Sequence, residues 1–475
     1  MSEYSAGMVG LGTMGHNLLL NMAGKGFSVA GYDRLAVQVD HLNDAANGLP
    51  VKGFHSLPDF VKSLALPRVI VLLVPAGKIV DAAISDLIPF LDKGDILIDS
   101  GNSHFSDTTA RVHRLQEQGF HFFGMGISGG EEGARVGASM MPGGDMEAYR
   151  YVKPLLEAVA ARVNGEPCVS YIGPGASGHF VKMVHNGIEY AMMQLIADTY
   201  EFLRKGIEFD NSAIHKVFYN WNEGRLKSYL LEITADIFLF KESGSDEFLI
   251  DQIRDQAKSK GTGKWTTQVS TDLELPVPTI DMAVVLRDLS KYKQLRTELS
   301  DLYHTEPKKS IEGNPEEWLV KLEKAFYFSM INIYAQGMHL LRKASVDYSY
   351  NLNMYEISKI WRGGCIIRAS LLEILCVAFQ KDGTIKHLLL DSNIQSIIKD
   401  SLPESRELVS KAMAAGISIP AFAATLSYFE SITHKNMPAN LIQAQRDYFG
   451  AHTYELIGRD GVFHTDWTKN QQPKI

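Results

Sequence analysis

The sequence predicts an α/β domain over residues 1–177, a large all-α domain built from an internal duplication over residues 178–435, and a C-terminal tail over residues 436–475. Short β-rich runs alternate with helix-compatible stretches in the first part, which is typical of a parallel sheet covered by helices. Long patterns with a 3.6-residue period follow. The tail begins at a proline-containing break and shows no steady amphipathic pattern.

The expected strands lie between Ala6 and about Ile172. They are the runs AGMVGLG, FSVAGYD, VIVLLVP, DILIDS and HFFGMGIS. Ligands of parallel sheets collect at the carboxyl ends of the strands. The loops after these runs are therefore candidate binding segments.

The helical region contains similar pieces in the same order, separated by 138, 140 and 141 residues. Three matches in order predict a duplicated helical unit. The matching pieces are YEFLRK and MHLLRK (from residues 200 and 338), Trp221 and Trp361, and two copies of LLEI (from residues 230 and 371).

The composition limits the partners of the protein. Its 475 residues are 45% hydrophobic and carry a net charge of −8, so we expect no extended nucleic-acid surface and no binding to anionic membranes. No apolar run approaches the ~20 residues needed to span a bilayer. The chain reaches an apolar strand by Met8 without a basic leader. We therefore expect a cytoplasmic protein.

The three cysteines, Cys168, Cys365 and Cys376, have no metal-ligand spacing, and pairing two of them would leave one over. This usage suits a reducing compartment. We expect buried thiols rather than a catalytic thiol, and no metal site.

A glycine-rich turn joins the first expected strand to a helix. Residues 10–15 read GLGTMG and fit G-x-G-x-x-G, with the helical run LLLNMAGKG after them and a second strand that ends at Asp33. The glycines allow a tight turn and close approach of the backbone to a pyrophosphate, whose charge the helix N-terminus stabilises. In this context the motif predicts a dinucleotide-binding Rossmann domain rather than a plain glycine-rich turn.

The residues after the second strand favour two different cofactors. Asp33 stands where a carboxylate accepts the adenosine ribose 2′-hydroxyl of NAD, whereas Arg34 can pair with the 2′-phosphate of NADP. A carboxylate about 4 Å from that phosphate would raise the energy by ~4 kcal/mol at an effective dielectric of 20. NADP therefore requires Asp33 to turn away, and NAD is the alternative cofactor.

Four polar residues of the segment GHFVKMVHNGIEY share one helical face. Lys182, His185, Asn186 and Glu189 are spaced i, i+3, i+4 and i+7, which brings a base, two hydrogen-bonding groups and an acid together. A solvated surface stripe has the same spacing. Two features favour a site: apolar residues surround the four, and the second copy of the repeat keeps none of His185, Asn186 and Glu189.

Three further segments carry polar groups on expected loops. DSGNSH (99–104) and GISGGEEGAR (126–135) follow strand ends. KGTGKWT (260–266) presents lysines and threonines between glycines, which suits a phosphate although it is not a P-loop. Arg287 and Arg446 are candidate anion clamps. The alternative for each segment is an ordinary turn, and for each arginine a surface position.

Seven strings resemble one family. GLGTMG, SGGEEGAR, MPGG, GHFVKMVHNGIEY, KGTGKWT, WRGGCIIR and RDYFGAHTYE occur in this order, and together they resemble the 6-phosphogluconate dehydrogenase family over essentially the whole chain. The resemblance implies oxidative decarboxylation of 6-phosphogluconate, a phosphorylated sugar acid, to ribulose 5-phosphate with reduction of NADP, as in the oxidative pentose phosphate pathway and gluconate utilization. It also implies a homodimer whose tails reach the partner subunit.

The resemblance assigns the chemistry to two residues. Lys182 would take the proton of the C3 hydroxyl while hydride leaves C3, and Glu189 would protonate C1 of the enediol after carbon dioxide is lost. Burial can lower the pKa of a lysine toward that of a useful base.

The resemblance also implies the binding residues. The expected cofactor contacts are Gly10, Leu11, Gly12, Thr13, Met14, Gly15, Asp33, Arg34, Val74, Pro75, Ala76 and Asn102. The expected substrate contacts are Asn102, Ser128, Gly129, Gly130, His185, Asn186, Tyr190, Lys260, Thr262, Arg287, and Arg446 with His452 from the other subunit.

The sequence departs from the family pattern at three places. Asp33-Arg34-Leu35 replaces an Asn-Arg-Thr or Asn-Arg-Ser run. Pro75 replaces the lysine of a V-K-A-G run, and Ser100 replaces the first glycine of D-G-G-N-S. These differences concern the choice between NADP and NAD, not the reaction.

Three other functions fit parts of the sequence. The run 126–130 matches the G-x-S-x-G of serine hydrolases, but the stretch after Ser128 is too glycine-rich to predict the helix that this motif requires. A non-catalytic nucleotide-binding protein leaves the polar face from Lys182 to Glu189 unexplained. A sister β-hydroxyacid dehydrogenase would share Lys182 but lack Glu189 and the phosphate contacts.

Overall fold

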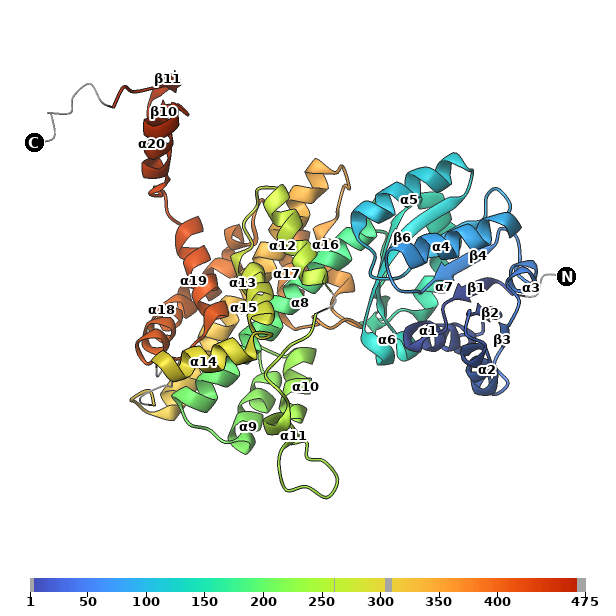
Figure 1. Ribbon diagram of the computed structural model, residues 1–475, viewed down its shortest axis with the longest axis horizontal. Helices are drawn as coiled ribbons and strands as arrows, with labels where there is room; N and C mark the ends of the chain where they lie inside the picture. Colours follow the sequence, from blue (N-terminus) through green and yellow to red (C-terminus); the bar gives the residue numbers. More distant parts are fainter. Residues whose placement is uncertain (1–3, 260, 304–309, 468–475) are drawn as a thin grey trace, which may run out of the picture. The chain divides into compact units, whose positions relative to one another are not determined.

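A seven-stranded sheet in the order β3-β2-β1-β4-β5-β6-β7 organises the N-terminal region of the computed structural model (Figure 1). The model describes residues 4–259, 261–303 and 310–467. Strands β1 to β6 run parallel, in the order typical of a Rossmann domain. The strands are β1 (Ala6–Val9), β2 (Val29–Tyr32), β3 (Val51–Phe54), β4 (Val69–Leu72), β5 (Ile96–Asp99), β6 (His121–Ser128) and β7 (Ser139–Gly144).

All five predicted strands are present, as β1, β2, β4, β5 and β6, but the prediction of a wholly parallel sheet was wrong at one edge. Strand β7 pairs antiparallel with β6. The connection between them, residues 129–138, is too short for the crossover that a parallel neighbour requires. Strand β3, with the sequence VKGF, was not among the predicted runs.

Helices cover both faces of this sheet. Met8 and Val9 are neighbours in β1 and belong to different hydrophobic cores, because successive strand side chains point to opposite faces. One core contains α1, α2 and α7, and the other contains α3, α4 and α5. These helices are α1 (Thr13–Gly24), α2 (Ala36–Ala45), α3 (Leu57–Lys62), α4 (Lys78–Leu87), α5 (Phe105–Glu117) and α7 (Met146–Val159), while α6 (Gly130–Val136) follows β6.

Two long helices dominate the second part, α8 (Ser177–Glu201) and α15 (Pro315–Asp347), and they pack against each other. The start of α15 follows from its sequence: Asn314 caps the helix, Pro315 occupies its first position, and two glutamates lie in the first turn. Two shorter α-helices follow each long helix, and the second helix of each pair holds one copy of LLEI. This order agrees with the predicted duplication.

The remaining helices complete the second part. They are α9 (Asn211–Asn222), α10 (Tyr229–Ile237), α11 (Leu249–Gln252), α12 (Thr262–Asp272), α13 (Pro278–Leu289), α14 (Lys293–Tyr303), α16 (Met354–Ile360), α17 (Leu371–Lys381), α18 (Ser392–Ala414) and α19 (Pro420–Ile432). No helix in the described ranges is both long enough and apolar enough to cross a membrane.

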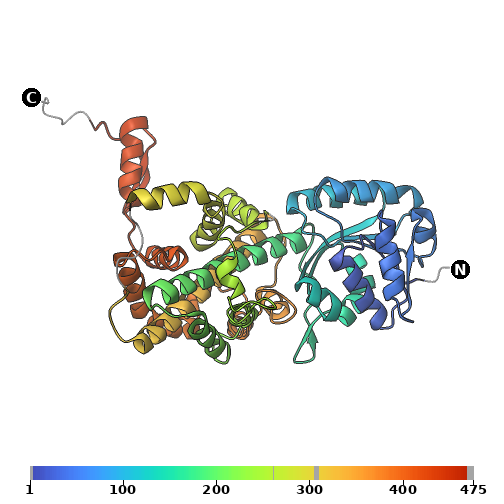
Figure 2. The same ribbon diagram turned by 60° about the horizontal axis from the view of Figure 1, so that its bottom comes forward.

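Glycines bring α8 against the sheet (Figure 2). A Cβ atom added to Gly143 of β7 would lie 2.3 Å from the backbone nitrogen of Gly178 in α8. A Cβ added to Gly124 of β6 would lie 2.5 Å from the ring of His179. Since neither space admits a side chain, the first turns of α8 lie directly on strands β6 and β7.

The chain divides after Thr425 into two compact units. The second unit contains α20 (Ala439–Gly450) and a hairpin of β10 (Tyr454–Leu456) and β11 (Arg459–Phe463). It is thus built from a helix and a hairpin of its own.

Asp447 of α20 organises this unit. Its fully buried carboxylate accepts hydrogen bonds from the backbone N–H of Thr453 and Thr465, from the His464 ring and from the Trp467 indole, all at 2.8–3.0 Å. Burial alone would raise its pKa, but the bonds from His464, Thr465 and Trp467 lower the pKa to about 2. The residues after α20 are therefore tied back to the helix through one carboxylate.

Candidate functional site

The four polar residues of α8 converge beside β6. Lys182 Nζ lies 3.4 Å from His185 Nδ1, which is 3.2 Å from Asn186 Oδ1 and 3.9 Å from Glu189 Oε2. Lys182, His185 and Asn186 are at most 7% exposed. The predicted helical face is present, and the alternative of a solvated stripe is wrong.

Burial sets the ionisation of this group. It lowers the pKa of Lys182, although Glu189 and Cys365 oppose the shift. It also raises the pKa of Glu189 against the effects of Lys182 and Arg287. Burial and the neighbouring Lys182 hold the pKa of His185 well below its usual value. These shifts move the amine toward its neutral form and the carboxyl toward its protonated form, which are the directions that a general base and a general acid require, and they favour the neutral imidazole.

Ser128, the last residue of β6, extends the cluster on its other side. Its Oγ lies 3.2 Å from His185 Nε2 and accepts a hydrogen bond from the N–H of Ile366 at 3.3 Å. The ring of Trp361 meets the His185 ring edge-on at 5.5 Å. Ile366 and Trp361 were not predicted as site residues; the only signal was the string WRGGCIIR, whose tryptophan was read as part of the repeat.

The turn after Ser128 corrects one prediction. A helix does follow, because Gly129 and Gly130 adopt positive φ angles of 129° and 64° that turn the chain, and Glu131 and Glu132 lie in the first turn of α6. The strand–turn–helix context of a serine hydrolase is therefore met. The acid near His185 is Glu189, at 3.9 Å, and it follows the histidine in the chain, whereas that family has the order serine, acid, histidine, so the arrangement does not favour that function.

A cavity of about 310 Å³ lies at the carboxyl ends of β1, β2 and β4. Gly10 has φ of +98°, and a Cβ on Gly15 would lie 1.9 Å from the Gly10 carbonyl oxygen. A Cβ on Gly12, in contrast, would meet nothing within 4 Å. The backbone thus packs tightly on itself at Gly10 and Gly15. At Gly12 it leaves free space, through which a pyrophosphate could approach the N-terminus of α1.

Six of the twelve predicted cofactor residues line this cavity, and the other six lie outside its lining. Its lining includes Gly10, Gly12, Asp33, Arg34, Val74 and Pro75. Leu11 lies within the glycine turn, Thr13, Met14 and Gly15 form the first turn of α1, Ala76 precedes α4, and Asn102 follows β5. A dinucleotide with its pyrophosphate at the N-terminus of α1 would have its adenosine beside Asp33 and Arg34.

The carboxylate of Asp33 is hydrogen-bonded to the backbone on both sides. Its Oδ2 accepts a hydrogen bond from the N–H of Leu11 at 2.7 Å, and its Oδ1 accepts one from the N–H of Leu35 at 2.9 Å. The carboxylate therefore holds the glycine turn to the end of β2.

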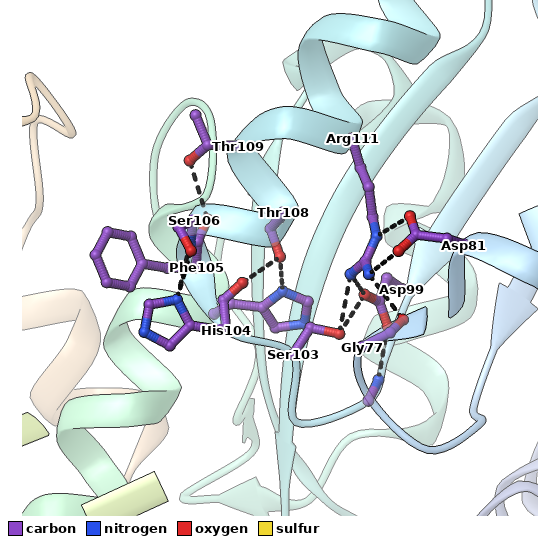
Figure 3. Close-up of polar contacts among 12 residues, drawn as sticks. Gly77, Asp81, Asp99, Ser103, His104, Phe105, Ser106, Thr108, Thr109 and Arg111 are labelled. Atoms are coloured by element: carbon purple, nitrogen blue, oxygen red, sulfur yellow. Dashed lines mark hydrogen bonds and ion pairs between the residues drawn. The ribbon is translucent and has the colours of Figure 1, made fainter. Parts of the chain in front are cut away.

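Arg111 of α5 connects two of these loops (Figure 3). Its guanidinium donates to both carboxylate oxygens of Asp81 at 2.9 and 3.0 Å and to the Gly77 carbonyl at 3.0 Å. It also reaches Asp99 Oδ2 at 3.3 Å and Ser103 Oγ at 3.4 Å. The 2% exposed arginine thereby ties the segment after β4 to the segment after β5, which carries Asn102.

A second, smaller cavity of about 210 Å³ lies next to Tyr190. The Arg287 guanidinium stacks 3.6 Å from the centre of the Tyr190 ring, and Lys264 and Lys291 also line the cavity. Several cations around one cavity suit a phosphate. Lys291 was not predicted; it stands four residues after Arg287, a spacing that could have identified it.

The segment KGTGKWT is not a loop as predicted. Gly261, in a left-handed conformation, precedes α12, which begins at Thr262. Thr262 is buried, and Gly263 leaves room for the Tyr190 ring, which a Cβ there would approach to 2.5 Å. Lys260 lies outside the described residues.

Comparison with known proteins shows the family. Residues 178–467 match the model of the 6-phosphogluconate dehydrogenase C-terminal domain, and residues 5–173 match that of the NAD binding domain of 6-phosphogluconate dehydrogenase. The chain belongs to the 6-phosphogluconate dehydrogenase family. The NADP(+)-dependent, decarboxylating 6-phosphogluconate dehydrogenase of Bacillus subtilis is 46% identical over 469 residues, covering 99% of this chain and all of the relative. The decarboxylating enzyme of Escherichia coli is 45% identical over 468 residues, covering 98% of this chain and all of that one.

A solved structure of the 6-phosphogluconate dehydrogenase family has the same fold. The Plasmodium falciparum enzyme, described in its apo form and in complex with NADP+ and with 6-phosphogluconate, superposes with a TM-score of 0.94 at 42% identity. The match covers 98% of this chain and 100% of that one. The Rossmann domain followed by a largely helical region is thus the fold of this family.

Two expected contacts of the family belong to the separate C-terminal unit. Arg446 lies in α20, where its Nη1 donates to Gln443 Oε1 at 3.2 Å, and His452 follows the helix and lies 5.9 Å from the Phe449 ring. The three cysteines are buried free thiols, as expected, and burial raises the pKa of Cys365 to about 12. This pKa disfavours a catalytic thiolate.

Proposed function

We propose that the protein oxidises 6-phosphogluconate with NADP and releases carbon dioxide and ribulose 5-phosphate. The observation that carries this function is the pair of Lys182 and Glu189 on one face of α8, with burial favouring the amine as a base and the carboxyl as an acid. A dehydrogenase that does not decarboxylate needs only the first of these groups.

The first step removes hydrogen from C3 of the sugar acid. Ser128, Gly129, Gly130, His185, Asn186 and Asn102 hold the carboxylate and hydroxyls of the substrate. Lys182 Nζ takes the proton of the C3 hydroxyl, and a bound nicotinamide ring supplies the acceptor for the hydride that leaves C3. Because neutral His185 carries no charge to repel a cation, it lets Lys182 accept the proton.

The second step breaks the bond to the carboxylate. The C3 ketone accepts the electron pair as carbon dioxide leaves, and the ammonium now present at Lys182 stabilises the developing enolate. Glu189 then delivers its proton to C1 of this enediolate, whose oxygen becomes the carbonyl of ribulose 5-phosphate. At the end of the reaction Lys182 is protonated and Glu189 is ionised, so each has the opposite protonation state from the one in which it began.

The remaining assignments concern the ends of the substrate and the assembly. Tyr190, Lys260, Thr262 and Arg287 bind the 6-phosphate, joined by Arg446 of the partner subunit and His452 of the partner subunit in a homodimer. These roles fall on three parts of the chain: the α/β domain of residues 1–177, the helical domain of residues 178–435 and the tail of residues 436–475. The enzyme works in the cytoplasm, in the oxidative pentose phosphate pathway.

One assay tests the reaction. Purified protein is supplied with 6-phosphogluconate and either NADP or NAD, and reduced nicotinamide and carbon dioxide are followed together. We expect one carbon dioxide for each reduced cofactor. Reduced cofactor without carbon dioxide would indicate a sister dehydrogenase, and neither product would indicate a binding protein.

A further inference from the structure

The adenosine end of the dinucleotide cavity holds an ion pair. Arg34 Nη2 lies 2.5 Å from Asp86 Oδ2, and both residues line the cavity together with the glycine turn. Asp86 is on α4, across the cavity from the end of β2 that carries Arg34. The cation that would meet a 2′-phosphate is therefore already bound to a carboxylate of its own chain.

Among the described residues that line this end of the cavity, no side chain other than Arg34 is a cation. Among the described lining residues, Arg34 stands with two carboxylates, Asp33 and Asp86, and with Leu35, which is 61% exposed and apolar. Asp33 is held in place by the backbone amides of Leu11 and Leu35. Around the 2′ position the cavity thus carries one positive and two negative side chains.

We propose that Asp86 sets the cofactor preference of this enzyme by weakening its affinity for the 2′-phosphate of NADP. A 2′-phosphate must displace Asp86 from Arg34 and lie near two carboxylates, whereas the 2′-hydroxyl of NAD is neutral and does neither. Removal of Asp86 should therefore raise the affinity for NADP relative to NAD. This inference rests on the proposed function and adds the residue that sets its cofactor choice.

Calorimetric titration of NADP and of NAD, without sugar acid, tests the inference. In Asp86→Ala we expect the ratio of the NADP Kd to the NAD Kd to fall about fivefold to tenfold. Asp44→Ala is the matched control, because it removes the same charge from an exposed position on α2 that does not line the cavity. Adding Arg34→Ala to Asp86→Ala should reverse most of this fall in the Kd ratio, because the released guanidinium is then no longer present to bind the 2′-phosphate.

Two results would overturn the inference. One is an unchanged ratio of the NADP Kd to the NAD Kd in Asp86→Ala. The other is an equal change of that ratio in Asp44→Ala, because the effect would then come from the net charge of the domain and not from Asp86. The Asp86 side chain is 49% exposed, so its replacement is compatible with folding, and Asp86→Asn repeats the test with the shape of the side chain retained. Turnover of 6-phosphogluconate by the wild type is measured separately. An unchanged Kd ratio together with wild-type turnover would reject only the role of Asp86. Absence of wild-type turnover would reject the proposed function.

Discussion

Gly126 of β6 and Lys182 of α8 lie so close that a Cβ atom on the glycine would be 2.3 Å from the Cβ of the lysine. No real side chain occupies such a gap without displacing its neighbour. Lys182, the proposed base, can therefore occupy its position only because Gly126 in the facing strand has no side chain.

Gly126→Ala should consequently move Lys182 and lower kcat by about 100-fold, the usual cost of displacing a reacting group by about 1 Å. Steady-state kinetics measure the effect, and circular dichroism checks the fold. Gly24→Ala, where an added Cβ meets nothing within 4 Å, is the control. Full activity in Gly126→Ala would show that the base has room to move.

Lys182→Met should abolish oxidation while leaving NADP binding nearly unchanged, because the amine acts on the substrate and not on the cofactor. Turnover and cofactor titration measure the two properties. Wild-type-like turnover would remove Lys182 from the role of base.

Glu189→Gln should slow the protonation of C1 more than hydride transfer, since glutamine cannot donate a proton. Single-turnover formation of reduced cofactor, compared with incorporation of solvent tritium into ribulose 5-phosphate, separates the steps. The pKa of Glu189 is raised above its usual value, and the acid must be protonated to act. The alkaline limb of the wild-type pH profile that reports this carboxyl should therefore disappear in the variant; its persistence would assign the limb to another group.

Arg111→Leu should lower the free energy of unfolding by about 3 kcal/mol, because it leaves the buried Asp99 without its ion pair. If Arg111 also positions the two loops, KM should rise for both cofactor and substrate in Arg111→Lys, which keeps the charge but not the fork that grips Asp81. Denaturant unfolding and kinetics measure these effects. A stability loss with unchanged KM values would limit Arg111 to a structural role.

Asp198 should make stability depend on pH. Burial raises its pKa to about 7, although bonds from Gln194 and from the backbone of Ala421 oppose the shift, whereas in the unfolded chain the pKa is about 3.9. The folded state binds the proton more tightly, so the stability from this group is present below about pH 4 and is lost as pH rises through about 7.

Asp198→Asn should remove about 3 kcal/mol of that pH dependence. Urea unfolding of both proteins at pH 5 and pH 8 measures the difference. Parallel pH profiles for wild type and variant would contradict the raised pKa.

Much of the fold could be predicted because it rests on local patterns. Five strands were found from apolar runs, and the face of α8 from the spacing of Lys182, His185, Asn186 and Glu189. The antiparallel β7 was missed because SMMPGG lacks the β-branched residues that mark strands. The helix after Ser128 was missed because its glycines suggested a loop, whereas they serve as the turn before it.

The parts of the site that could not be predicted depend on contacts between distant segments. Ile366 reaches Ser128 across 238 positions of the sequence, and neither residue indicates the other. Likewise, Asp86 has nothing in its own helix to mark it as the partner of Arg34. Such pairs become visible only when the chain is folded.

The single carboxylate of Asp447, with its four donors from the residues after α20, has a consequence for assembly. In the proposed homodimer, a segment already ordered in this way would surrender little conformational entropy when it docked on a second copy of the chain. Association of the two proposed subunits would then match preformed surfaces, whereas a C-terminal unit without that carboxylate would also have to become ordered on contact.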